Sequence, residues 1–356
     1  LRMRAAKDRG LKGRLSEKVR CYFHGLYAGD MKEIPGLAIA ANWTSAAGAL
    51  DGILQHFGLA LPRHAIMGLT GHAWHTCIAR RGDLIALPSG SADLDWGAMV
   101  QRYARTGYRW DRFSRTVAAG EAPDIARAEA IAWAVPHLDA GRPLLGWDFH
   151  LHEHAIVYGY DPAREGFLVH DVLSEEVGPI ALWRDWPSVI GRIELYAPVE
   201  PFEADPFETV TGALQTALEC FAGEDGVADG QPRGTAGLDA WADAFDSEVE
   251  VDRAGNAYTL AVLQGARMDG ADFLADLAAS LPDLAPPLLA AERAIRDEVL
   301  ALSPLITLFP FPTGGHGNVG NAGLRRGAAM ALRRAAQHER AAAGQIVEAL
   351  RLLNEE

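Results

Sequence analysis

Four side chains that can move protons or bind metal ions occupy alternate positions shortly after residue 147: Asp148, His150, His152 and His154. Alternation that runs into an apolar segment is typical of a β-strand with one polar face, so all four would point the same way. Imidazoles titrate near neutral pH and are common metal ligands. We therefore expect the chemistry on this face, as a site for a divalent metal ion or as a polar pocket lined by histidines.

Length and charge limit the classes of function. The chain has 356 residues, of which 49% are hydrophobic, so two domains are expected. The formal net charge of −14 argues against nucleic-acid and membrane partners. Three cysteines lie far apart without a CxxC pair, which fits a reducing cytoplasm. We expect a cytoplasmic protein that requires no cofactor, with a divalent metal ion as the open alternative.

The sequence pattern changes near residue 200, where strand signals give way to Ala- and Leu-rich helical segments. We expect a basic N-terminal extension (1–35), an α+β domain (36–200) and an all-helical domain (201–356) with a mobile, Gly-rich loop near 223–236. In the α+β domain, helices are predicted near 45–57, 93–105 and 123–139, and strands near 76–87, 144–158, 167–171 and 193–197. In the helical domain, apolar periodicity predicts helices near 206–222, 237–246, 256–280, 284–302 and 323–353.

Three segments of the first domain carry ingredients of a papain-type site. Residues 42–58 form a capped amphipathic helix that ends at Gly58. Residues 67–77 form a Gly-punctuated loop that leads into a strand. The histidine strand is followed by Tyr158-Gly-Tyr-Asp161 and later by a segment that ends in Asp171. A helix N-terminus, a histidine strand and an aspartate on the next strand suit nucleophilic catalysis.

These segments resemble the bacteriocin-processing (C39-like) cysteine peptidases and, more closely, the amino-terminal domain of the butirosin biosynthesis acyltransferase group. The resemblance rests on His56-Phe57-Gly58 at the helix end, on the run from His154 to Asp161 and on Val169-His-Asp171, and it covers roughly residues 36–200. It implies a papain-like (C39-peptidase-like) α+β fold followed by the helical domain. It also implies a site in which a Cys opens the helix, a His is the base and an Asp orients it.

The expected cysteine nucleophile is missing. The family's spacing places Ser45 at that position, and Asn42 is the nearest substitute for the oxyanion donor. A serine hydroxyl gains less than a thiol from a helix N-terminus and needs a better-placed base. Ser45 could equally act as a helix N-cap. Cys77, close to His72 and His75, could be a displaced nucleophile, although a lone cysteine in an apolar strand is more often inert core.

The same region offers a ligand pocket. Flat apolar walls would come from tryptophans and polar contacts from histidines and their neighbours. The candidate ligand-binding residues are Trp43, His72, Trp74, His75, Trp147, His152, Glu153 and Tyr160. Glu153 would point to the opposite strand face. Gly315-His-Gly-Asn-Val-Gly320 matches GxGxxG spacing but lacks a preceding strand, so a turn is favoured over a phosphate site.

The leading hypothesis is a catalytically silent papain-like protein that binds a small molecule or an acyl or peptidyl group in the inherited cleft. The alternative is an acyltransferase or amide hydrolase in which Ser45 attacks, His154 is the base and Asp171 orients it. A metal site on Asp148, His150, His152 and His154 is the third possibility. The long Ala-rich final helix could also form a homodimer surface.

Overall fold

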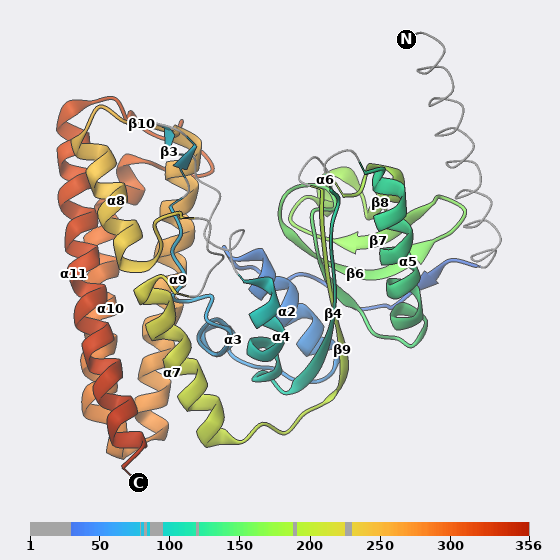
Figure 1. Cartoon of the computed structure of the whole chain (residues 1–356), viewed down its shortest axis with the longest axis horizontal. Coiled ribbons are helices and arrows are strands. Elements are labelled where there is room, and N and C mark those ends of the chain that lie inside the picture. Colours follow the sequence, from blue (N-terminus) through green and yellow to red (C-terminus); the bar gives the residue numbers. More distant parts are fainter. Residues whose placement is uncertain are drawn as a thin grey trace. The chain divides into compact units, whose positions relative to one another are not determined.

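A computed structural model describes residues 30–78, 80–81, 84–85, 95–118, 121–187, 191–224 and 230–355. The chain forms two compact units, each assembled from separate stretches of sequence (Figure 1). The first unit holds the described residues through Ala41 together with those of Gly48–Ala60 and Arg109–Pro201. The second holds Asn42–Ala47, Leu61–Tyr108 and the chain from Phe202 onward. The architecture is α+β, as the sequence predicts.

The first unit contains one β-sheet, which has seven strands within the described residues. Its order is β4-β9-β5-β6-β7-β8, with β1 paired to β6. The strands are β1 (Lys32–Glu33), β4 (Tyr108–Thr116), β5 (Leu144–Trp147), β6 (His154–Asp161), β7 (Gly166–His170), β8 (Ile180–Leu182) and β9 (Arg192–Pro201). Strand β5 pairs antiparallel with both β6 and β9, and β6 pairs antiparallel with β7. The central strands are almost wholly buried, which their Val- and Leu-rich sequences require.

The core of this unit lies between the sheet and helix α5 (Pro123–Asp139). Proline is the first residue of α5, where its missing N–H costs no hydrogen bond, and the helix has the bounds that were predicted. The remaining elements are the greater part of α2 (Ser45–His56), the short helix α6 (Ser174–Val177) and the 3₁₀ turn η2 (Trp183–Asp185).

The second unit is built mainly from helices. They are α3 (Arg63–Thr70), α4 (Trp96–Ala104), α7 (Pro206–Ala222), α8 (Gly234–Asp246), α9 (Arg253–Ser280), η3 (Pro282–Leu284), α10 (Ala285–Leu308) and α11 (Ala322–Leu353). The side chains of Asp205, Asp252 and Asn321 cap α7, α9 and α11 by accepting hydrogen bonds from their first-turn N–H groups. The five helices predicted after residue 201 are confirmed. The short strands β2 (Arg80–Arg81), β3 (Leu84–Ile85) and β10 (Glu250–Val251) form a small separate sheet.

The single strand predicted over 144–158 is wrong. Strands β5 and β6 form an antiparallel hairpin in which Trp147 is opposite His154, and residues 148–153 connect them. Asp148 has a positive φ of 69°, and its N–H donates to the Glu153 carbonyl, which closes the connection. The alternating polar residues therefore lie in the connection between two strands and not on one strand. Glu153 belongs to this connection, so the prediction that it points to the opposite face of a strand is wrong.

The division into units differs from the boundary predicted near residue 200. Residues 61–108 group with the helices because α3 packs against α7 and α9. The Gly68 backbone lies directly against the Phe273 ring: a Cβ at Gly68 would be 2.2 Å from Cγ of that ring. The predicted N-terminal extension through residue 29 and residues 225–229 of the predicted loop lie outside the described residues. Among the described helices, none is long and apolar enough to cross a membrane.

Candidate functional site

The histidines of the β5–β6 connection form two separate pairs with carboxylates. His150 Nδ1 lies 2.9 Å from Asp171 Oδ2, and its Nε2 lies 3.3 Å from the Ile180 carbonyl. Asp171 also accepts hydrogen bonds from the Leu173 N–H and the Ser174 hydroxyl. Asp171 thus holds His150 and the turn after β7, and the structure gives it no hydrogen bond to His154.

The second pair joins Asp148 and His152 across the same connection. Asp148 is buried, and its Oδ1 lies 2.7 Å from His152 Nδ1, whereas the His152 side chain is half exposed. The positive φ of Asp148 is a conformation that Asp adopts more readily than most residues. A buried carboxylate that fixes one nitrogen of an imidazole selects its tautomer and its orientation.

These pairings separate the four residues predicted as metal ligands. In the part of the chain that the structure describes, no group of three or more His, Cys, Asp or Glu side chains is arranged to hold a metal ion. The expectation of a common polar face fails because the strand that would create it reverses at Asp148. His154, at the start of β6, is fully buried, and its ring meets Trp147 edge-on at 4.9 Å between centroids.

Ser45 is the first residue of α2 and is buried. Three residues earlier, the Asn42 side chain accepts a hydrogen bond from the Thr44 N–H at 2.9 Å, so Asn42 helps to start the helix. Ser45 belongs to the second unit, whereas His154 and Asp171 belong to the first. The predicted triad is therefore not a site of either unit by itself.

A small cavity in the second unit brings together two of the predicted ligand-binding residues, His72 and His75. It is lined by Thr44, His72, His75, Thr76, Cys77, Thr259, Val262, Leu263 and Ala266. About 20 Å³ of this space can hold the centre of a water molecule, so the cavity accommodates one water or a terminal group of a few atoms. The cavity contains the two histidines and the cysteine of the Gly-punctuated segment, which makes it the candidate functional site.

In the cavity lining, His72 Nε2 and Thr259 Oγ1 have no hydrogen-bond partner within the described residues. Both residues are only 4% exposed. Leaving a buried polar group without a partner costs about 1–3 kcal/mol, so such groups usually mark a place for water or a ligand. The cavity is therefore equipped to bind a group that can hydrogen-bond to an imidazole and a hydroxyl.

The electrostatic surroundings keep His72 neutral. Burial, together with the nearby His75 and Arg102, lowers its pKa to about 3. Arg102, on α4, is itself buried, and its nearest acidic partner is Glu219 at 3.5 Å. A neutral imidazole can donate or accept a hydrogen bond at pH 7, but with so low a pKa it is a weak base.

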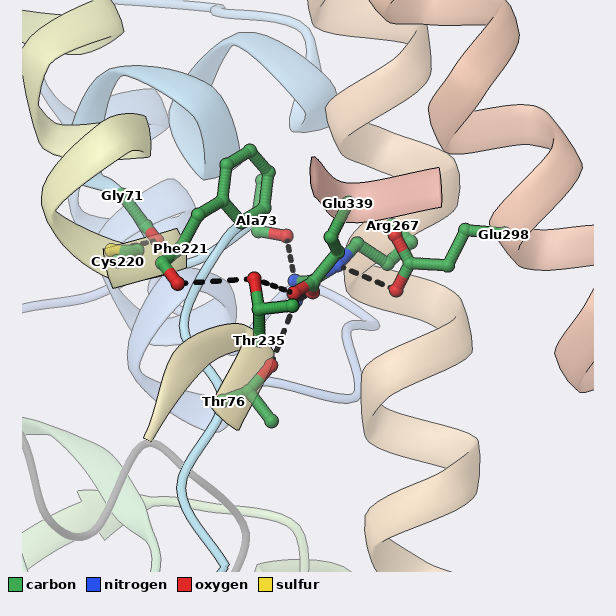
Figure 2. Close-up of polar contacts among 9 residues, drawn as sticks. All are labelled: Gly71, Ala73, Thr76, Cys220, Phe221, Thr235, Arg267, Glu298 and Glu339. Atoms are coloured by element: carbon green, nitrogen blue, oxygen red, sulfur yellow. Dashed lines mark hydrogen bonds and ion pairs between the residues drawn. The ribbon is translucent and has the colours of Figure 1, made fainter. Parts of the chain in front are cut away.

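The segment that carries both histidines is anchored by a buried guanidinium on α9 (Figure 2). Arg267 donates to the Ala73 carbonyl at 2.6 Å and to the Thr76 hydroxyl at 2.7 Å. It also pairs with Glu298 of α10 at 3.0 Å and with Glu339 of α11. All three charged side chains are fully buried. Thr76 lines the cavity, so this network fixes one wall of the site.

The network needs a bound proton to be neutral. Burial raises the pKa of Glu298 well above its usual value, and the charge of Glu339 raises it further, although Arg267 opposes both effects. A protonated Glu298 leaves one cation and one carboxylate in the interior. Glu339 also accepts a hydrogen bond from the Thr235 hydroxyl at 3.0 Å.

The other predicted ligand-binding residues serve different surroundings. Trp74 is fully buried, with its ring edge-on to Phe221, and does not line the cavity. Tyr160 donates to Asp139 in the first unit at 2.7 Å. Trp43 is 44% exposed, with its ring 6.0 Å from that of Phe311. None of the three tryptophans expected to form flat walls, Trp43, Trp74 and Trp147, lines this cavity.

The GxGxxG segment is a turn at the start of α11, as favoured from its context. His316 stacks on Phe311, and the Asn321 side chain caps α11 by accepting from the N–H groups of Gly323 and Leu324.

Sequence reasoning missed Thr259 and the three members of the buried charged network. Their signal was present: Arg267 and Glu339 interrupt Ala- and Leu-rich helical segments at positions that the apolar periodicity assigns to the interior. A scan against protein-family models finds no match for this chain, and no curated protein matches its sequence.

Proposed function

We propose that this protein binds a small molecule through an amide or acyl group that enters the cavity of the second unit, and that it does so without catalysis. The observation that carries this proposal is the pair of unsatisfied atoms, His72 Nε2 and Thr259 Oγ1, in one lining. A carbonyl oxygen would accept from the Thr259 hydroxyl, and an amide N–H would donate to His72. The two atoms therefore complement one amide group.

Binding is favoured over catalysis by the chemistry of the lining. His72 is too weak a base to activate a nucleophile at neutral pH, because its pKa is about 3. Cys77 is 1% exposed, and a fully buried cysteine is usually inert. We also propose a papain-like ancestry. It is supported by the position of α2 before the strands of the antiparallel sheet and by the motifs that end at Gly58, Asp161 and Asp171.

The test uses the full chain with ¹⁵N-labelled histidine and acetamide as the probe. We expect a saturable shift of the His72 ring resonances, with a dissociation constant on the order of millimolar for so small a ligand. Thr259→Val should abolish saturation because it removes the hydroxyl. Thr211→Val is the matched control, because Thr211 Oγ1 on α7 is also buried without a partner but lies outside the cavity lining.

Two results would contradict the proposal. A shift that grows linearly with acetamide and is the same in Thr259→Val would mean that the probe acts through the solvent. Stable acylation of Ser45 or Cys77 by p-nitrophenyl acetate, read by intact mass and lost on mutation of a histidine, would mean that the protein is an enzyme.

A further inference from the structure

An apolar groove runs along the outer face of helices α10 and α11. It consists of two hollows of about 370 and 430 Å³ that share Leu300, Ala301 and Arg334. The remaining lining residues are Asp297, Pro304, Leu305, Leu308, Gly327, Met330, Ala331 and His338. On each helix these positions recur every three or four residues, so each helix contributes one continuous stripe.

The groove carries two large apolar side chains that are mostly exposed to solvent. Met330 is 70% exposed and Leu300 is 67% exposed, the two highest values for large hydrophobic residues in the described part of the chain. Both line the same hollow, together with the small residues Ala301, Gly327 and Ala331. Exposed apolar side chains that gather beside a hollow, rather than lying singly, mark an interaction surface.

The polar end of the groove holds one acidic and one basic side chain that lack partners in the described chain. Neither Asp297 nor Arg334 has an ion pair there, although both are exposed. Elsewhere on α11, Arg333 pairs with Asp243, and Arg340 and Arg351 also have acidic partners. The groove thus presents opposite charges on its two helices and is complementary in charge to itself.

We propose that this groove is the interface of a homodimer in which a second copy of the chain packs across α10 and α11 around a two-fold axis. A two-fold interface uses the same patch on both copies, so the patch must carry both projections and hollows and both signs of charge. The stripe meets both requirements. Met330 and Leu300 fit the small-residue hollows, and Asp297 pairs with Arg334 of the partner subunit.

The resulting interface is a four-helix arrangement, because α10 and α11 from each copy pack face to face. Its apolar centre lies around Leu300 and Met330, and its charged end lies at Asp297 and Arg334. This inference is independent of the proposed ligand site, which is lined by Thr44, the segment 72–77 and residues of α9.

Sedimentation velocity on the full chain, from about 0.5 to 50 μM, tests the proposal. The wild-type protein should sediment as a dimer in the upper part of this range. Met330→Lys should weaken the dimer at least tenfold, because it places a charge at the apolar centre. Val347→Lys is the matched control: Val347 is 54% exposed on the same helix but lies outside the groove, so this variant should leave the dimer unchanged.

A charge swap separates specific pairing from a loss of folding. Asp297→Arg should weaken the dimer because it faces Arg334 of the partner subunit, and adding Arg334→Asp in the same chain should restore it. Circular dichroism should be the same for all variants. A wild-type protein that stays monomeric throughout, or a dimer that neither Met330→Lys nor Asp297→Arg weakens, would overturn the proposal.

Discussion

Replacing Glu298 by glutamine should change how the stability of the protein depends on pH. Glu298, on α10, is fully buried against Arg267 of α9, and its pKa is raised well above its ordinary value of 4.5 by burial and by the charge of Glu339. A carboxyl whose folded-state pKa is raised contributes stability that is fully present below pH 4.5. That contribution is lost as the pH rises through the folded-state pKa. Glutamine is nearly the same size as protonated glutamate and has no proton to lose.

The magnitude follows from one proton. In the window above pH 4.5, the free energy of unfolding of the wild type falls by at most about 1.4 kcal/mol per pH unit relative to the variant. Between pH 5 and pH 7, the difference in the free energy of unfolding should therefore change in favour of Glu298→Gln by up to about 2.7 kcal/mol.

Removal of the buried cation should destabilise the protein. Arg267→Met should cost about 3–5 kcal/mol at neutral pH, because it leaves the Glu339 carboxylate buried without its partner.

The assay is urea unfolding followed by circular dichroism at several pH values between 5 and 8, on the wild type and on Glu298→Gln. Glu348→Gln, on the exposed face of α11, is the control. Arg351 lowers the pKa of Glu348, so this carboxyl gains no proton from folding and the variant's difference from wild type should not move in favour of the variant's stability as the pH rises. A difference for Glu298→Gln that is constant, or that shrinks as the pH rises, would refute the bound proton.

Two further outcomes follow from the second unit. The His72 ring should not titrate between pH 5 and pH 8 in NMR spectra. Because its pKa is lowered to about 3, the protein should lose stability as the pH falls from 6.5 toward 3; a His72 midpoint near 6.5 would show that the ring is solvated. Gly68→Ala should destabilise the protein by about 1–3 kcal/mol, since its Cβ would meet the Phe273 ring at 2.2 Å. Gly344→Ala, on an exposed face of α11 with open space around it, should instead stabilise by up to about 1 kcal/mol, and equal effects of the two substitutions would contradict the close packing of α3.

The helices could be predicted because their signals are local. Asp205 and Pro206 start α7, Gly223 ends it, and the apolar repeat fills the space between, so its bounds follow from consecutive residues. Helix α3 was missed because eight residues provide little periodicity. Its place in the second unit depends on Gly68, whose partner Phe273 lies more than 200 positions later. A local sequence pattern cannot indicate a contact between residues so far apart in the chain.

The candidate site was predictable in part. The segment that carries His72 and His75 was recognised as unusual from its glycines and histidines, and the structure places both side chains in one cavity. Thr259 was not recognised, because a threonine inside an apolar helix has no pattern of its own. The histidine hairpin was misread for a physical reason. Asp148 in the left-handed region reverses the chain without a glycine, the residue that normally signals such a turn.

The buried network of Arg267, Glu298 and Glu339 is connected directly to the lining of the cavity, and this connection gives a reason for three charged side chains in the interior. Arg267 reaches the Ala73 carbonyl and the Thr76 hydroxyl, on either side of His75, so movement of this guanidinium would shift the lining of the cavity. Apolar substitution of a buried ion pair is often neutral or stabilising, so stability alone does not account for such a network. The pair Arg267→Met and Glu339→Met should therefore restore much of the stability that Arg267→Met loses. Acetamide binding should stay lost in the double variant, because the segment that holds His72 has no anchor; recovery of both properties would mean that the network does not position the site.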